Sequence, residues 1–105
     1  MTELALTGFL GLSAALLGIG VFGILTRRNF ILLLIAIEVG MNAAILNFVY
    51  FAAFPAGTSG LSGQSIAVVL IGFAATEVAV GLAIVLALNR LKGTINVARA
   101  TDLKL

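Results

Sequence analysis

The chain contains neither cysteine nor histidine among its 105 residues. Without these side chains it has no disulfide framework and no zinc, haem or iron–sulfur site of the usual kinds. Charge is also scarce, because only 10% of the residues are Asp, Glu, Lys or Arg, against about 25% in ordinary soluble domains. This number of charged side chains is too small to cover the surface of a soluble globular domain. A soluble globular protein is therefore excluded.

Apolar residues make up 62% of the chain, and the mean hydropathy is +1.26. Both values indicate a membrane protein. One proline and twelve glycines fit transmembrane helices, in which glycine is common. The pI of 9.7 does not indicate a nucleic-acid partner, because the six basic residues gather at the ends of apolar runs, as membrane topology requires.

Three apolar runs, at about 4–25, 30–54 and 64–88, account for most of the chain. Each is long enough to cross a hydrocarbon core of about 30 Å. They predict an all-α membrane protein, a single unit over 1–105 with three transmembrane helices. The segment "PAGTSGLSG" is typical of a turn-rich second loop, and 89–105 of a polar tail. We expect the first run to be a retained helix, because basic residues follow it rather than precede it.

Basic residues also predict the orientation of the three helices. Arg27 and Arg28 lie in the first loop, whereas the N-terminus and the second loop contain no basic residue. The predicted tail contains the remaining four basic residues, Arg90, Lys92, Arg99 and Lys104. With three crossings the first loop and the tail share one side, which the positive-inside rule places in the cytoplasm. The N-terminus is then outside and the C-terminus cytoplasmic.

Two glutamates interrupt the apolar runs. Glu38 lies eight residues into the second helix, roughly 12 Å deep, and Glu77 lies eleven residues before the end of the third, roughly 16–17 Å deep. An ionised group at the centre of a helix costs on the order of 3 kcal/mol, so the pair favours a function. Two acids at similar depth suit a lateral proton relay, which crosses little of the membrane potential. The alternative is two protonated structural hydrogen-bond donors.

Asn42 lies beside Glu38 on the same face of the second helix. It either orients the acid or holds a water there, or it forms a simple interhelical hydrogen bond. Asn47 falls on the opposite face. Arg27 and Arg28 either set topology alone or also make an electrostatic contact at the cytoplasmic loop.

Small residues predict where helices approach closely. Ala74 and Gly81 flank Glu77 and would let a helix or water reach its carboxyl group. Thr76 points away, and its hydroxyl can bond to its own helix. On the first helix a small-residue stripe predicts a packing face, formed by Gly8, Gly11, Ala15 and Gly18.

The two acid-bearing segments resemble the K subunit of respiratory complex I, the proton-pumping NADH:quinone oxidoreductase. "LTRRNFILLLIAIEVGMNAAILNF" is similar to the family's arginine-rich turn followed by an acid and "N-A". "GQSIAVVLIGFAATEVAVGLAIVLALNR" is similar to its third helix, with the form "A-A-x-E-x-A-V/I-G-L-A". The resemblance covers almost the whole chain.

This resemblance implies a multi-pass subunit of the cell inner (plasma) membrane, in contact with the A, H, J and N types of subunit. Glu38 and Glu77 match the family's two intramembrane acids. FMN, iron–sulfur clusters, NADH and quinone would belong to the rest of the complex, so this chain would carry no cofactor and perform no redox chemistry.

Other membrane proteins offer alternatives. Related subunits occur in membrane-bound hydrogenases, in the archaeal dehydrogenase of the reduced deazaflavin coenzyme and in Mrp-type antiporters, although the antiporter type usually lacks the two acids. A rotor-ring proteolipid has two helices and one acid, and a small multidrug transporter has four helices. The last alternative is a purely structural subunit that only assists assembly. In that case glutamine could replace either glutamate without loss of function.

Overall fold

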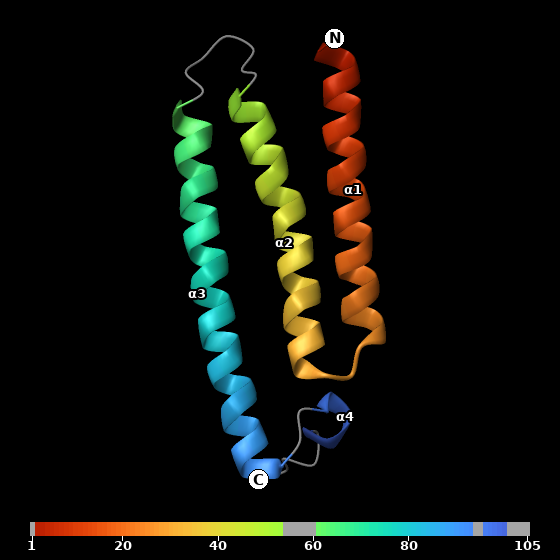
Figure 1. Cartoon of the computed structure of the whole chain (residues 1–105), viewed down its shortest axis with the longest axis vertical. Coiled ribbons are helices and arrows are strands. Elements are labelled where there is room, and N and C mark those ends of the chain that lie inside the picture. The colour runs from red at the N-terminus through yellow and green to blue at the C-terminus, as the bar shows by residue number, and fades with distance from the viewer. Residues whose placement is uncertain (1, 54–60, 94–95, 101–105) are drawn as a thin grey trace.

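A computed structural model describes residues 2–53, 61–93 and 96–100 of the chain (Figure 1). The described part is helical: α1 spans Thr2–Thr26, α2 Phe30–Ala53, α3 Leu61–Lys92, and a single turn, α4, Val97–Ala100. Helix α2 lies between α1 and α3 and packs against both, whereas α1 and α3 share almost no contacts. The prediction of three membrane-spanning helices is confirmed by the length and apolar composition of α1, α2 and α3.

Helix α3 is longer than the apolar run predicts. It begins at Leu61 rather than 64 and continues to Lys92, four residues beyond the expected end at 88. Basic side chains in this last turn complement the negative end of the helix dipole, so the polar residues extend the helix. Gly93, with a φ of 64°, then ends it by donating its N–H to the carbonyl of Asn89 at 2.8 Å. Most of the predicted second loop, at 54–60, lies outside the described residues.

Helices α1 and α2 approach closely through small residues. A Cβ atom added at Gly20 would lie 2.8 Å from the backbone nitrogen of Gly40 and 2.9 Å from the carbonyl oxygen of Ala36. One added at Gly23 would lie 2.6 Å from the Cβ of Ala36. Small side chains let transmembrane backbones come together in this way, where apolar burial gives little advantage over lipid.

The stripe predicted from sequence is not the one that packs within the chain. Gly8, Gly11, Ala15 and Gly18 are all exposed. A Cβ atom added at any of the three glycines would meet nothing within 4 Å. Gly20 lies about 200° around the helix from Gly18, so α1 carries small residues on two faces, and sequence periodicity alone did not identify the face that contacts α2.

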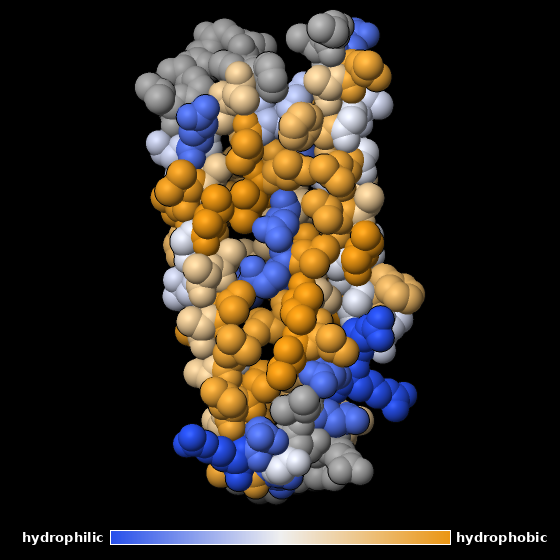
Figure 2. Space-filling model, in the orientation of Figure 1, coloured by the Kyte–Doolittle hydropathy of each residue, from blue (hydrophilic) through white to orange (hydrophobic). Residues whose placement is uncertain are grey.

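The outer surface of the bundle is apolar. Figure 2 shows hydrophobic side chains over most of the middle of the visible face, interrupted by a hydrophilic strip near its centre, and further hydrophilic residues near the end that carries the α1–α2 connection. Large side chains such as Phe22 on α1 and Val68 on α3 are more than half exposed. A surface of this kind is suited to contact with lipid or with other transmembrane helices.

We expect Gly20→Ala to weaken the complex that contains this chain, because the new methyl group meets rigid backbone atoms of α2. Overpacking of this kind costs about 1–3 kcal/mol. The amount of chain recovered in intact complex, and the thermal stability of that complex, measure the effect. Gly18→Ala and Gly72→Ala are matched controls, since neither new methyl group meets anything within 4 Å. Equal losses in all three variants would contradict the α1–α2 contact.

Candidate functional site

Two close contacts set the packing of α2 against α3. A Cβ atom added at Gly81 would lie 2.7 Å from the Cδ1 of Leu34, and one added at Gly63 would lie 2.7 Å from the Cβ of Ala52. Leu34 and Ala52 are 18 residues apart, and so are Gly63 and Gly81. At 3.6 residues per turn this is about five full turns. Both contacts therefore use one face of each helix, in a single antiparallel register.

Glu38 and Glu77 occupy matching positions in this register. Glu38 is four residues after Leu34, and Glu77 is four residues before Gly81. Because the helices are antiparallel, both steps run in the same direction along the bundle, and each covers about one turn. The two acids therefore lie at one level.

The two depths counted from the predicted helix ends differ by roughly 4 Å, and the register explains this difference. Position 88 lies three residues beyond the level of Phe30, so the two predicted ends were not level. Three residues of helix account for about 4.5 Å. Matching the helices through their contacts removes the discrepancy.

Glu38 lies on the side of α2 that faces α3, one turn from Leu34. It is half-buried, and its Oε1 atom is enclosed without a hydrogen-bond partner among the described residues. Ala36 and Gly40, which contact α1, lie on the opposite side of α2. An enclosed carboxyl oxygen without a partner is unfavourable, so this atom needs a proton, a water or a donor from outside the described residues.

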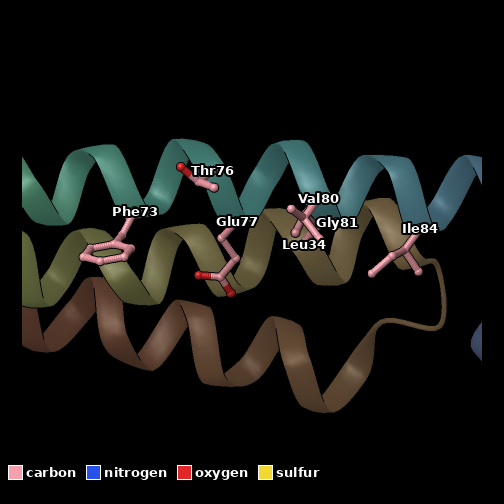
Figure 3. Close-up of a pocket in the computed structure, with 7 residues that line it drawn as sticks. All are labelled: Leu34, Phe73, Thr76, Glu77, Val80, Gly81 and Ile84. Atoms are coloured by element: carbon pink, nitrogen blue, oxygen red, sulfur yellow. The ribbon is translucent and has the colours of Figure 1, made fainter.

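Glu77 is exposed and opens onto a groove along the outside of α2 and α3. The groove has a volume of about 490 Å³, and its other lining residues are Leu34, Phe73, Thr76, Val80, Gly81 and Ile84. Figure 3 shows the Glu77 side chain extending from α3 toward the side on which α2 lies, between Phe73 and Ile84 along the groove. The lining is otherwise apolar, apart from Thr76.

Of the two small residues that flank Glu77, Gly81 contacts α2, and the access that they give to the carboxyl group stays a prediction. Ala74 is 7% exposed, and Gly81 lies against Leu34. The hydroxyl of Thr76 donates to the carbonyl of Gly72 at 2.9 Å, and Figure 3 shows this side chain pointing away from α2. Thr76 therefore contributes little polarity to the space around the carboxyl group.

The two asparagines of α2 have different surroundings. Asn42 is exposed, and no hydrogen bond joins it to Glu38 in the part of the chain that the structure describes. The Oδ1 atom of Asn47 is enclosed and lacks a partner within the same residues. Asn47 lies seven residues from Gly40, and so on the α1 side. The role of Asn42 beside Glu38 stays a prediction.

Arg27 and Arg28 are exposed in the short connection between α1 and α2. Neither forms an ion pair with Glu38 or Glu77 within the described residues. The next residue, Asn29, has a structural role that the sequence reasoning above did not predict. The Oδ1 atom of Asn29 accepts hydrogen bonds from the backbone N–H groups of Ile31 at 2.9 Å and Leu32 at 3.4 Å. An asparagine directly before an apolar run is the signal of such a helix cap.

Fold and site together define a multi-pass membrane protein with two ionisable groups at one level of an apolar bundle. Among the described residues no three His, Cys, Asp or Glu side chains come together where they could hold a metal ion. Intramembrane acids of this kind are typical of subunits that handle ions or protons.

Comparison with known proteins identifies the family. The family model for NADH-ubiquinone/plastoquinone oxidoreductase chain 4L matches residues 8–105. The chain is 46% identical to NADH-quinone oxidoreductase subunit K of Anaeromyxobacter sp. (strain K) over 89 residues, 85% of this chain and 87% of that protein. It is 44% identical to subunit K 1 of Syntrophobacter fumaroxidans over 99 residues, 94% of this chain and 96% of that protein. It is 42% identical to subunit K of Geobacillus kaustophilus over 101 residues, 96% of this chain and 99% of that protein.

The chain belongs to the chain 4L, or subunit K, family of NADH-quinone oxidoreductase. The resemblance carried by the two acid-bearing segments is thereby confirmed, and the related complexes are not favoured. As a member of this family the chain is a membrane-arm subunit of a proton-translocating enzyme complex and is not itself a redox catalyst. The flavin and the iron–sulfur clusters of the complex are not carried by this subunit.

The α2–α3 register predicts which engineered cysteines can be joined. Leu34→Cys combined with Gly81→Cys should form a disulfide on mild oxidation, since the two positions are in direct contact. Leu34→Cys with Phe73→Cys is the control, because Phe73 lines the same groove but lies two turns, about 12 Å, along α3 from Gly81. The chain has no cysteine of its own, so mass spectrometry of the oxidised complex reads the pairing directly. Preferential joining in the control pair would disprove the register.

Proposed function

We propose that Glu38 and Glu77 are two protonatable positions of a lateral proton-transfer step in the membrane arm of NADH-quinone oxidoreductase. The observation that carries this proposal is their shared level in the α2–α3 register. Moving a charge across the whole membrane potential changes its energy by about 2.3 kcal/mol per 100 mV. A proton passing between two groups at one level crosses almost none of that potential, so this subunit supplies a link rather than a complete channel.

The two acids differ in access, which gives the step an inner and an outer position. Glu38 has an enclosed oxygen without a hydrogen-bond partner among the described residues. In the proposed step a proton binds to this carboxyl group and relieves the cost of the unpartnered oxygen. Glu77 is exposed on an open groove, where a group on a neighbouring subunit can reach it. Because an ionised carboxyl group here costs on the order of 3 kcal/mol, each transfer needs a nearby water or compensating charge.

Three further residues support the relay in this proposal. Asn42 is one turn from Glu38 on α2 and is exposed, so its amide can hold a water beside the acid. Arg27 and Arg28 are exposed at the end of the bundle nearer to both acids. There they attract acidic groups of neighbouring subunits, in addition to setting topology.

Neighbouring subunits have to cover the Glu77 groove, because an acid facing lipid is costly. We infer that subunits of the A, H, J and N types surround this chain. The same proposal places the chain in the cell inner (plasma) membrane, with the α1–α2 connection and the C-terminus in the cytoplasm and the N-terminus outside. The exposed apolar side chains on all three helices support extensive contact with other helices.

We expect Glu38→Gln and Glu77→Gln each to reduce proton pumping and coupled quinone reduction in an assembled complex by about tenfold or more. Glutamine keeps the size and a hydrogen-bonding end but cannot release a proton, and positioned proton transfer contributes about 10²–10⁴-fold to rate. Electron transfer and pumping are measured together in membrane vesicles. Glu3→Gln, an acid in the first turn of α1, is the matched control and should behave as the unmodified chain.

A relay in series makes a further prediction for the double variant. Because a proton has to pass both acids, Glu38→Gln with Glu77→Gln should be no slower than the more severe single variant, as with other residues that act as a unit. Normal pumping by both single variants, in complexes present at normal levels, would mean that the glutamates are structural hydrogen-bond donors and that the chain only assists assembly.

The proposed orientation is tested by labelling from one side of the membrane. Glu3→Cys should react with a membrane-impermeant maleimide added outside intact cells, whereas Lys92→Cys should react only after the membrane is opened. Both positions are exposed at opposite ends of the bundle, and the chain has no other cysteine. The reverse pattern of labelling would invert the topology.

A further inference from the structure

The segment after α3 returns to the connection between α1 and α2. The backbone N–H of Val97 donates to the carbonyl oxygen of Arg28 at 2.6 Å, and Asn29 and Asn96 form an isolated antiparallel β-bridge. Figure 1 shows α4 beneath the α1–α2 connection, beside the lower end of α3. Residues far apart in the sequence are thus joined backbone to backbone at this end of the bundle.

Both sides of the bridge are built in the same way. Asn29 caps the start of α2, and the Oδ1 atom of Asn96 accepts a hydrogen bond from the N–H of Ala98 at 2.9 Å. A residue that caps a helix has an extended backbone, which is also the conformation needed for a β-bridge. The two asparagine caps therefore prepare both segments for pairing.

Among the described residues, no long helix lies beside the last seven residues of α3. The register that pairs Leu34 with Gly81 places Phe30, the first residue of α2, level with Val85. Helix α3 continues for seven further residues, to Lys92, which is about 10 Å. Leu86 and Leu91 in this segment are 61% and 75% exposed. Since α1 shares almost no contacts with α3, neither long helix holds this end.

We propose that Asn96–Ala98 is a clasp that joins the end of α3 to the α1–α2 connection, and that Asn96 and Val97 are positioning residues for the two acids. The acids lie in the half of the bundle nearest to the clasp, one turn from the Leu34–Gly81 contact. That contact rests on a flexible leucine side chain, and the Gly63–Ala52 contact is 18 residues away. A link at the near end keeps α3 from tilting away from α2.

The functional part of this inference rests on the proposed relay, whereas the clasp itself is tested independently. The Val97–Arg28 hydrogen bond flanks the bridge, which makes Asn29 and Asn96 a non-hydrogen-bonded antiparallel pair. Such pairs have Cα atoms about 4.5 Å apart, within the range that a disulfide spans. Asn29→Cys with Asn96→Cys should therefore form a disulfide within the chain when the assembled complex is mildly oxidised. Because these substitutions also remove both asparagine caps, the cysteine pair with Val97 retained is the reference for each measurement.

Val97→Pro removes the clasp hydrogen bond, and its ring carbon Cδ, placed where the amide hydrogen met the carbonyl oxygen of Arg28, also pushes the two segments apart. Proline lacks the N–H group, but it is favoured at the first position of a helix, where Val97 lies. It also keeps the preceding residue extended, as Asn96 requires. Val97→Ala is the matched control, since it shortens the side chain and retains the N–H. We expect Val97→Pro to slow disulfide formation between the two cysteines by at least about fivefold, the population change produced by one lost hydrogen bond, because the proline ring also crowds the Arg28 carbonyl. Val97→Ala should leave the rate unchanged.

Proton pumping distinguishes positioning from simple structural support. In complexes present at equal levels, Val97→Pro should lower the number of protons pumped per electron about twofold, and Val97→Ala should not. Complete oxidation of the cysteine pair in the Val97→Pro chain should restore that ratio, and reduction should lower it again.

Four results would overturn all or part of the inference. If the cysteine pair forms no disulfide, the clasp does not exist. The same conclusion follows if the disulfide forms equally well in the Val97→Pro and Val97→Ala chains. If the proton-to-electron ratio is normal in Val97→Pro but collapses in Glu38→Gln, the clasp does not position the acids. The proposed relay then still stands. Normal pumping in both glutamine variants removes the relay and the functional half of the inference, whatever the disulfide shows.

Discussion

Glycine contacts on the two sides of α2 set the geometry of the whole bundle. Lipid tails are as apolar as leucine, so these helices gain little from burying apolar side chains against one another, and steric fit decides how they pack. Gly20 and Gly23 seat α1 against one side of α2, and Gly81 seats α3 against the other. The Gly20 contact with backbone atoms of α2 is rigid, whereas the Gly81 contact meets the flexible end of the Leu34 side chain and fixes the α2–α3 register less firmly.

The placement of the acids follows from this central position of α2. Glu38 turns toward α3, because Ala36 and Gly40 occupy the side that faces α1. Glu77 sits at the margin of the α3 surface that contacts α2, about 40° around the helix from Gly81. One carboxyl group is therefore half-buried within the subunit, and the other is exposed on its outer face. This difference suits a step that carries a proton between the interior of the chain and a neighbouring subunit.

Much of this arrangement could be predicted from the sequence, because its signals are local. Apolar runs of transmembrane length predicted the three helices, and two acids inside such runs predicted the candidate site. The face of α1 that packs could not be identified, since Gly8, Gly11 and Gly18 are as small as Gly20 and Gly23. The Asn29–Asn96 bridge joins segments more than sixty residues apart. A backbone pairing over that distance cannot be predicted from a local sequence pattern. The extra turn of α3 was missed because its polar residues extend a helix as well as apolar ones do.

In the proposed relay, steric contacts between residues that cannot ionise also matter for proton transfer. A slip of one residue between α2 and α3 moves a side chain by about 1.5 Å along the helix and about 100° around it. The translation is small, but the rotation would carry Glu77 out of its groove and away from the side on which α2 lies. The proposed proton transfer at Glu77 therefore depends on the contact between Gly81 and Leu34, although neither residue can bind a proton. A relay built from two flexible carboxyl groups becomes a directed step only when the helices that carry them cannot rotate past one another.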